Sequence, residues 1–194
     1  MKGSLLGIFK IVTMKNICYY LFFLFFLSAN VHAQLGSQFP NLEGETLLNK
    51  QVVIPSDTKE KFTLLGMAYS KKSEEDLKTW FNPIYQKFIY KPKNPGLFYT
   101  EYDVNVYFIP MFTGVKKAAY GKVMKKMKDK TDPKLVPHIM FYKGELKKYK
   151  EALDFEKKDV PYFFVLDKQG KIVFVTSGSY NDDKLDEIEN LLEE

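Results

Sequence analysis

Three groups of side chains in this sequence carry the chemistry that catalysis uses: a thiol, a pair of neighbouring hydroxyls and an imidazole. Cys18 is the only cysteine of the 194 residues, so the chain has no second thiol with which to form an internal disulfide. Ser70 and Ser73 need a positioned base to act as nucleophiles, and the only histidine after residue 33 is His138, far away in sequence. We therefore interpret Ser73 as a helix cap and His138 as a loop histidine without a catalytic task.

A metal centre is not predicted. A bound metal ion needs three or four ligands, whereas the chain after residue 33 offers no cysteine and a single histidine. Glu74 with Glu75, and Asp182 with Asp183, are carboxylate pairs of the kind that hard cations use. Adjacent residues diverge on a helix, and both pairs lie where helices should begin, so we interpret them as complements to the helix dipole. We expect no metal and no other cofactor.

Residues 1–33 have the organisation of a secretory signal peptide. A short positive segment precedes an apolar run at residues 17–29, and small residues precede a predicted cut after Ala33. A membrane-spanning helix needs about 20 apolar residues, which is longer than this run. We expect cleavage and a periplasmic or secreted protein, with translation starting at Met1 or Met14. The alternative is a protein that an uncleaved N-terminus anchors in the membrane.

The charge of the chain argues against nucleic acid as a partner. Three of the 29 basic residues lie in residues 1–33, which contain no acidic residue, so 26 basic residues face 24 acidic ones in the remainder, a net charge of +2. Every basic residue is a lysine, so the chain lacks the planar guanidinium group that reads guanine or phosphate through two hydrogen bonds. We expect no nucleic-acid binding.

Residues 34–194 are long enough for a single domain with its own core. The apolar run at 62–69 predicts a buried central strand, and the apolar spacing over 73–88 predicts a helix kinked at Pro83. Residues 160–175 predict a β-hairpin around a turn with glycine. The other expected elements are two short strands around a Glu43-Gly44 turn within 38–47, strands at 51–54 and 102–109, a helix at 115–130 with Val115, Ala119, Val123 and Met127 on its buried side, a strand or loop at 137–142, and helices at 146–155 and 182–194. This order predicts an α/β fold of three layers, α/β/α, with a mixed central sheet.

This order of elements over residues 38–194 resembles the thioredoxin-like superfamily with an N-terminal β extension. Residues 160–173, Val-Pro-Tyr-Phe-Phe-Val-Leu-Asp-Lys-Gln-Gly-Lys-Ile-Val, look like the superfamily's cis-proline strand and hairpin, which implies a cis bond before Pro161. Residues 39–44, Phe-Pro-Asn-Leu-Glu-Gly, resemble the start of thiol reductases and peroxiredoxins. Trp-Phe-Asn-Pro at 80–83, and the segment from Tyr162 to Gly178, resemble the thioredoxin-like assembly factor family of the mitochondrial ATP synthase, which lacks a reliable cysteine pair.

The superfamily's Cys-x-x-Cys would lie within residues 69–75, where this sequence has no cysteine. Thiol–disulfide exchange needs a thiolate, which a serine hydroxyl cannot replace. The resemblance therefore implies a binding surface at the former redox site, made by Tyr69, Ser70, Lys71, Lys72, Ser73, Val160, Pro161 and Tyr162. An aromatic groove of Tyr69, Trp80, Phe112 and Tyr162 is one form of that surface, and core packing is the alternative for Trp80.

The expected helix at 115–130 concentrates positive charge. Its basic patch is Lys116, Lys117, Lys122, Lys125 and Lys126; Lys128 and Lys130 extend it, and Asp129 is the only acid. Such a surface attracts anionic lipid head groups or an acidic partner. The alternative is a solvated face that the acidic C-terminal helix partly neutralises.

These observations favour a redox-inactive, exported protein that binds a protein or peptide, or assists assembly, over an enzyme. Cys18 lies in the segment expected to be removed, so no thiol would remain. An extended partner could pair with the strand edge near Val160. Two alternatives stay open: an oxidoreductase-derived enzyme, thiol–disulfide or peroxide-linked, that uses a partner's thiols, and a membrane-associated assembly factor whose lysine helix lies on lipid.

Overall fold

A computed structural model describes residues 34–97 and 99–193 of the chain. The predicted signal peptide at 1–33 lies outside the described residues. Residues Gln34–Glu194 form one compact unit. Within the described ranges, no helix has both the length and the apolar character that crossing a membrane requires.

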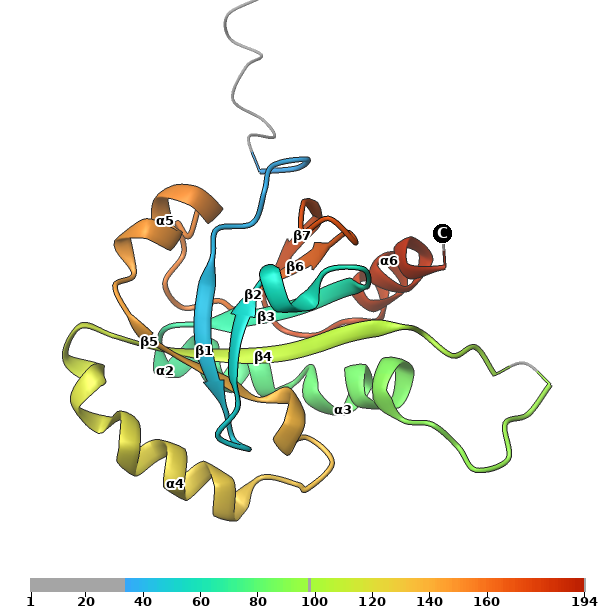
Figure 1. Ribbon diagram of the computed structural model, residues 1–194, viewed down its shortest axis with the longest axis horizontal. Coiled ribbons are helices and arrows are strands. Elements are labelled where there is room, and N and C mark those ends of the chain that lie inside the picture. The colour runs from blue at the N-terminus through green and yellow to red at the C-terminus, as the bar shows by residue number, and fades with distance from the viewer. Residues whose placement is uncertain (1–33, 98, 194) are drawn as a thin grey trace, which may run out of the picture. The chain divides into compact units, whose positions relative to one another are not determined.

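The centre of this unit is a seven-stranded mixed sheet (Figure 1). Its strands are β1 (Leu42–Thr46), β2 (Gln51–Ile54), β3 (Phe62–Ala68), β4 (Val104–Thr113), β5 (Met140–Gly144), β6 (Tyr162–Leu166) and β7 (Ile172–Ser177). Their spatial order is β2-β1-β5-β4-β3-β6-β7. The β3–β4 and β4–β5 pairs are parallel and all other neighbours are antiparallel. The predicted mixed sheet is confirmed.

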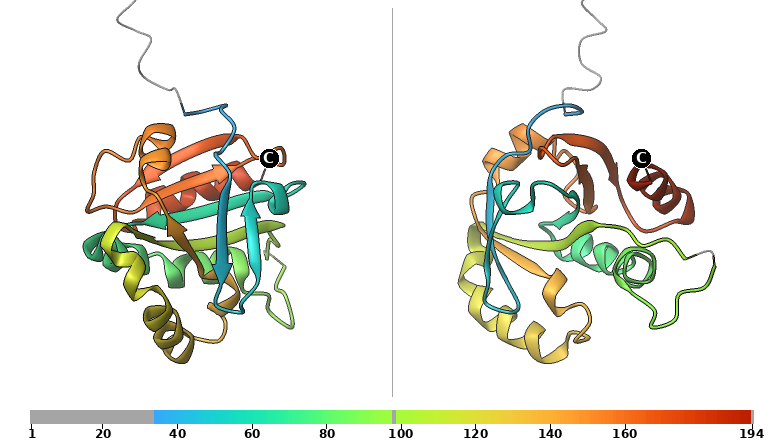
Figure 2. Two further views of the ribbon diagram at one scale, coloured as in Figure 1. Left: turned by 60° about the vertical axis from the view of Figure 1, so that its left-hand side comes forward. Right: turned by 45° about the vertical axis from the view of Figure 1, so that its right-hand side comes forward.

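Helices connect the strands and cover the sheet. They are η1 (Ser56–Thr58), α2 (Lys71–Lys78), α3 (Phe81–Ile84), the π-helical η2 (Tyr85–Ile89), η3 (Gly114–Ala119), α4 (Tyr120–Lys130), η4 (Val136–His138), α5 (Lys147–Leu153) and α6 (Asp182–Leu192). Side chains of α2, α3, α4 and α6 pack in one core cluster, and those of α5 and of the β1–β2 hairpin pack in another. In the left view of Figure 2 this hairpin stands across β3 and β4, with α2 and α3 behind them. The three predicted layers are therefore present.

Strand β3 shows why both faces need cover. Leu65 and Met67 point into the cluster with α5, whereas Leu64 and Ala68 point into the cluster with α2 and α6. Successive side chains of a strand alternate between faces, so a continuous apolar run places apolar groups on both. Leu64, Leu65 and Met67 are each no more than 1% exposed, as expected for a central strand.

The predicted helix at 73–88 is broken upstream of Pro83. Helix α2 ends at Lys78, and a second helical segment begins at Phe81, with the indole of Trp80 fully buried between them. Proline has no N–H to bond the carbonyl one turn earlier, so a continuous helix cannot pass this point with all its bonds. Leu77, Trp80, Ile84 and Phe88 nevertheless enter one core cluster, as their spacing predicts.

The turn expected at Glu43 and Gly44 is wrong. Glu43 and Gly44 lie inside β1 and not in a turn. A Cβ at Gly44 would lie 2.8 Å from Cγ of Met140 and 2.9 Å from the carbonyl oxygen of Phe141, so the glycine is needed for the close approach of β5. The turn lies farther on, where Thr46 accepts from the backbone N–H of Asn49, which has a left-handed φ of 59°.

The helix expected at 115–130 is also divided, into the 3-10 segment η3 and helix α4. Val115 was expected on the buried side, but it is 94% exposed. Ala119, where the conformation changes, was also expected on the buried side but is exposed, and Tyr120, Val123, Met124 and Met127 of α4 pack against the core as half-buried side chains. By contrast, the hairpin of β6 and β7 and the C-terminal helix α6 are confirmed, with Leu185 and Ile188 of α6 buried.

Candidate functional site

The surface predicted from the missing cysteine pair lies where β3 ends and α2 begins. Ser70 is the N-cap of α2, three residues before the expected cap. Its Oγ accepts a hydrogen bond from the backbone N–H of Ser73 at 3.0 Å, and Oγ of Ser73 accepts from the N–H of Ser70 at 2.9 Å. This reciprocal capping box satisfies two N–H groups that the first turn of a helix otherwise leaves unpaired.

Ser70 and Ser73 have the spacing of a Cys-x-x-Cys pair, a match that our sequence analysis did not use. The two Oγ atoms are 3.1 Å apart, and the residues are 4% and 0% exposed. Neither hydroxyl has a base beside it: Nδ1 of His138 lies 3.1 Å from the carbonyl oxygen of Val106, part-way along β4, and burial lowers the pKa of its imidazole. The pair is therefore a helix cap and not a nucleophile.

Aromatic stacking closes the surface that was expected to bind. The ring of Tyr69 stacks on Phe155 at 5.6 Å, and Phe155 lies 4.7 Å from the ring of Tyr162. Tyr69 and Tyr162 are only 5% and 7% exposed, and the hydroxyl of Tyr69 donates to the carbonyl oxygen of Phe155 at 3.3 Å. Burial raises the pKa of Tyr69 to about 12. These rings are core residues that cannot line a groove.

The expectation of one aromatic groove is wrong for a second reason. Tyr69 and Tyr162 belong to the core cluster that contains α5, whereas Trp80 and Phe112 belong to the cluster on the other face of the sheet. The indole N–H of Trp80 donates to the carbonyl oxygen of Gly178 at 3.0 Å, as expected of a buried tryptophan with a satisfied polar group. Core packing, the alternative reading, holds for Trp80.

The proline predicted to be cis is trans. Among residues 34–97 and 99–193, the only cis peptide bond precedes Pro55. Pro161 is buried and Val160 is half-buried. The carbonyl oxygen of Pro161 accepts from the N–H of Gly178 at 2.9 Å, which continues the pairing of β6 with β7. Trans is the lower-energy form for most X-Pro bonds, and the backbone at Pro161 is engaged within the sheet.

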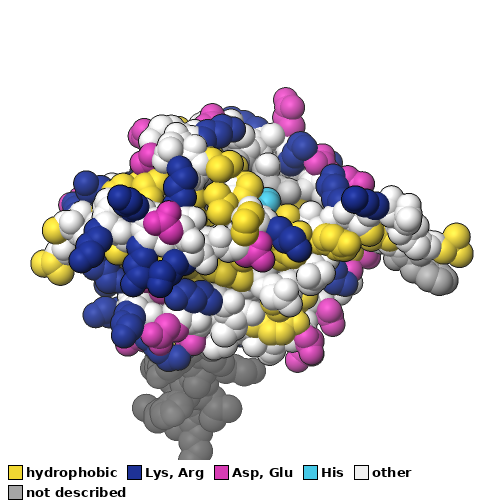
Figure 3. Space-filling model, turned by 90° about the horizontal axis from the view of Figure 1, so that it is seen from below, with side chains coloured by type: hydrophobic (Ala, Val, Ile, Leu, Met, Phe, Trp, Pro, Cys, Tyr) yellow, Lys and Arg dark blue, Asp and Glu magenta, His cyan; other side chains and the backbone are white. Residues whose placement is uncertain are grey.

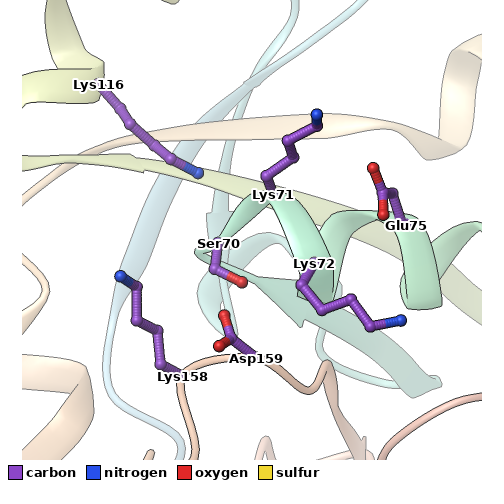
Figure 4. A pocket seen from close by; sticks show the side chains of 7 residues that line it. All are labelled: Ser70, Lys71, Lys72, Glu75, Lys116, Lys158 and Asp159. Atoms are coloured by element: carbon purple, nitrogen blue, oxygen red, sulfur yellow. The ribbon is translucent and has the colours of Figure 1, made fainter.

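What remains open at this place is a charged hollow of about 480 Å³, shown in Figure 4. Seven residues line it: Ser70, Lys71, Lys72, Glu75, Lys116, Lys158 and Asp159. We call these residues the charged hollow. They come from the start of α2, from η3 and from the loop before β6. Only Ser70, Lys71 and Lys72 were among the binding residues predicted from sequence.

Lys116, Lys158 and Asp159 come from other parts of the chain, which the fold places next to the start of α2. Lys116 follows β4, which runs parallel to β3, so the carboxyl ends of both strands meet at the same edge of the sheet. Lys158 and Asp159 directly precede the Val160-Pro161 pair that the sequence placed at this surface. The parallel pairing of neighbouring strands could have identified Lys116, and extending the predicted segment by two residues would have included Lys158 and Asp159.

The charges of the hollow are only partly paired. Nζ of Lys116 lies 3.0 Å from Oε1 of Glu74 and 3.3 Å from the carbonyl oxygen of Tyr69. Nζ of Lys72 lies 2.8 Å from Oδ1 of Asp76, and this hydrogen bond raises the pKa of its ammonium group. Within the described ranges, the exposed Lys71 and Lys158 have no carboxylate within 4.0 Å. The hollow thus offers two unpaired ammonium groups beside the carboxylates of Glu75 and Asp159.

This chemistry suits binding. The part of the chain that the structure covers contains no group of three His, Cys, Asp or Glu side chains placed to hold a metal ion. The hollow contains no thiol and no histidine, and Oγ of Ser70 is engaged in the helix cap. Exposed ammonium and carboxylate groups can pair with charges and amides of a polypeptide.

The predicted basic patch is divided in the structure. Lys116 and Lys117 lie in η3 and pair with Glu74 and Glu145 respectively. Lys122, Lys125 and Lys126 lie in α4 and are exposed. The expected partial neutralisation by α6 is not seen in the described ion pairs, in which Glu189 of α6 pairs with Lys87.

Known structures with this fold cover most of the chain. BsSco, described as a member of the Sco family of cytochrome c oxidase assembly proteins, is 11% identical with a TM-score of 0.53, over 81% of this chain and 94% of that one. A putative thiol:disulfide interchange protein DsbE from Chlorobium tepidum is 14% identical with a TM-score of 0.52, over 82% and 96%. A secreted thiol-disulfide isomerase from Corynebacterium glutamicum is 16% identical with a TM-score of 0.51, over 81% and 86%. At these identities the likeness shows the thioredoxin-like fold.

Sequence comparison gives the family. No curated protein matches the chain. The family model described as ATP10 protein matches residues 27–194. This match agrees with the resemblance to the thioredoxin-like assembly factors of the ATP synthase at Trp80 to Pro83 and at Tyr162 to Gly178. Because the model spans all but the first 26 residues, the chain belongs to the ATP10 protein family.

Proposed function

We propose that this chain is a redox-inactive assembly factor that, after export and removal of residues 1–33, binds a segment of a client protein in the charged hollow. One observation carries the proposal: the two positions with cysteine-pair spacing hold Ser70 and Ser73, whose hydroxyls are used up in a buried helix cap. Family membership supports the assembly role. The similar fold of BsSco, from a family described as assembly proteins, is consistent with it.

Redox inactivity follows from the number and place of the thiols. Disulfide exchange passes through a mixed disulfide that a second thiol resolves. The chain has a single cysteine, Cys18, so it cannot resolve such an intermediate internally. A thiol of another protein would have to resolve it, and at the start of α2 it would meet the stacked rings of Tyr69, Phe155 and Tyr162.

Client binding follows from the unpaired charges. Lys71 and Lys158 come from different elements and reach the same hollow (Figure 4). Their ammonium groups can meet carboxylates of a client, while Glu75 and Asp159 can accept from its amides or lysines. A surface of mixed charge favours orientation and partner selection over tight binding. Transient binding of this kind suits a factor that must release the assembled product.

The direct test is complementation in a host from which the gene has been deleted. The measured quantity is the amount of assembled ATP synthase on native gels, because the sequence resembles assembly factors of this enzyme. We expect the deletion to lower it, and both the wild-type chain and Cys18→Ala to restore it. Lys71→Glu with Lys158→Glu should fail to restore it, whereas Lys59→Glu with Lys168→Glu, an exposed pair outside the hollow with the same charge change, should succeed.

Each arm removes a separate part of the proposal. Failure of Cys18→Ala, with normal protein abundance, would show that the thiol is required. Restoration by the Lys71 and Lys158 reversal would remove the hollow as the client site. If the hollow is the client site, photocrosslinkers at Lys71 and Lys158 should capture one common client, and one at Lys59 should not.

A further inference from the structure

Helix α4 carries the largest concentration of uncompensated charge in the described part of the chain. Its exposed lysines are Lys122, Lys125, Lys126, Lys128 and Lys130. Within residues 34–97 and 99–193, none of them has a carboxylate within 4.0 Å. Figure 3, which views the molecule from below, shows lysine side chains gathered on this side. Lys116 and Lys117 are excluded from this set because both are ion-paired.

The position of the lysines on α4 makes them one outward surface. Residues three and four apart lie on the same side of a helix, so Lys122, Lys125 and Lys126 form a continuous row. The opposite side, with Val123, Met124 and Met127, rests against the core of the domain. The apolar side of α4 is therefore already used, and what the helix presents to a partner is five lysines with one acid, Asp129.

An exposed apolar side chain lies on the same side of the unit. Leu48 is 58% exposed in the turn between β1 and β2, and Lys50 in that turn is also exposed. The end of this turn and α4 both lie at the lower side of the domain in Figures 1 and 2. The N–H of Leu47 donates to the carbonyl oxygen of Ile139 at 3.1 Å, which fixes the turn to the residue directly before β5.

We infer that α4 and the β1–β2 turn form a docking surface for an anionic lipid bilayer. The lysines would lie among the phosphate groups, and Leu48 would enter the boundary between head groups and acyl chains. We call α4 with this turn the lysine face. It is separate from the charged hollow, so a protein resting on a membrane through one surface keeps the other free for a client.

The chemistry favours a bilayer over other anionic partners. The chain contains no arginine, which is the residue suited to bidentate recognition of one fixed carboxylate or phosphate. Lysines act as mobile point charges and match a laterally mobile field of phosphates. Each lysine near an anionic membrane strengthens binding about fivefold, and salt weakens the effect because the Debye length is about 8 Å at physiological ionic strength.

The test uses the chain from Gln34 onward, because Gln34–Glu194 contains the whole sheet and both core clusters. Binding is measured by cosedimentation with vesicles of phosphatidylcholine alone or mixed with phosphatidylglycerol. We expect binding only to the mixed vesicles, and weaker binding as salt rises. Lys125→Gln with Lys126→Gln should weaken it about 25-fold, at about fivefold per lysine. Leu48→Ser should weaken it several-fold.

Matched variants identify the surface. Lys59→Gln with Lys168→Gln has the same charge change at two exposed lysines elsewhere, so it should bind the mixed vesicles as the wild type does. The hollow variant Lys71→Glu with Lys158→Glu should lose no more affinity for the mixed vesicles than Lys59→Glu with Lys168→Glu, which has the same charge change outside both surfaces. This comparison separates the lysine face from the client site. Equal binding to both kinds of vesicle, an unchanged affinity of the Lys125 and Lys126 variant, or no vesicle binding at all would overturn the inference.

Discussion

The glycine at the centre of β3 allows a quantitative test of the packing around α2. A Cβ added at Gly66 would lie 2.6 Å from Cε1 of Phe163 and 2.8 Å from Cδ1 of Leu77. Both neighbours are fully buried, and the ring of Phe163 lies 4.1 Å from that of Trp80, which is also fully buried. The ring therefore has no free space into which to move.

The expected cost of Gly66→Ala follows from two opposing effects. Forcing an extra methyl group into a packed core costs about 1–3 kcal/mol. Alanine lowers the entropy of the unfolded chain relative to glycine, which returns about 0.4–1 kcal/mol. The free energy of unfolding should fall by about 1–2 kcal/mol, equivalent to a Tm lower by about 2–8 °C for a domain of this size.

Gly121 provides a control with the same chemical change and the opposite sign. It lies in α4, its φ is not in the left-handed region, and a Cβ there meets nothing within 4 Å. Gly121→Ala should therefore stabilise the protein by about 0.4–1 kcal/mol. Urea denaturation at equilibrium measures both variants, and the slope m should not change. If Gly66→Ala proves as stable as the wild type, the close packing of β3, Leu77 and Phe163 is refuted.

Two further predictions concern the capping serines and the buried tyrosines. Ser73→Ala leaves the buried N–H of Ser70 without its partner and should lower the free energy of unfolding by about 1–2 kcal/mol in the same urea assay, whereas the exposed Ser56→Ala should change it by less than about 0.5 kcal/mol. Tyr69 and Tyr120 have pKa values raised from 10.0 to about 12, by burial and, for Tyr120, by donation to Glu45. The folded state then holds more protons than the unfolded state between pH 10 and 12, so stability should fall across this window, and Tyr69→Phe with Tyr120→Phe should make the fall shallower; an unchanged slope would refute the assignment.

Elements with strong local patterns were predictable from the sequence. The apolar run of β3, the hairpin of β6 and β7, and the stripe of Leu185 and Ile188 in α6 all fold as their spacing indicates. Gly44 was misread because its reason lies in β5: the side chain of Met140 and the backbone of Phe141 leave no room for a Cβ. A single sequence read locally assigns such a glycine to a turn, the commoner place for it.

The position of the candidate site was predictable, but its exposed residues were only partly so. Locating the end of β3 required only the apolar run and the start of the next helix. Tyr69 is shielded from solvent by Phe155. This residue follows α5, far away in sequence, and its ring stacks on the ring of Tyr69. Lys116 lines the hollow because β4 pairs with β3 in parallel. Local sequence patterns do not reveal this pairing.

Where the superfamily has its cysteine pair, this chain differs by more than the absence of two sulfur atoms. Ser70 and Ser73 keep the spacing of a cysteine pair, but each hydroxyl has become part of the cap that starts α2. A cysteine is a weaker hydrogen-bond donor and acceptor than a serine, so restoring either thiol would weaken the cap. Even a restored pair would stay buried, because the side chains at these positions are 4% or less exposed. The serine cap and the aromatic stack of Tyr69, Phe155 and Tyr162 thus both stabilise the end of β3, and thiol exchange at this place would require changes in both.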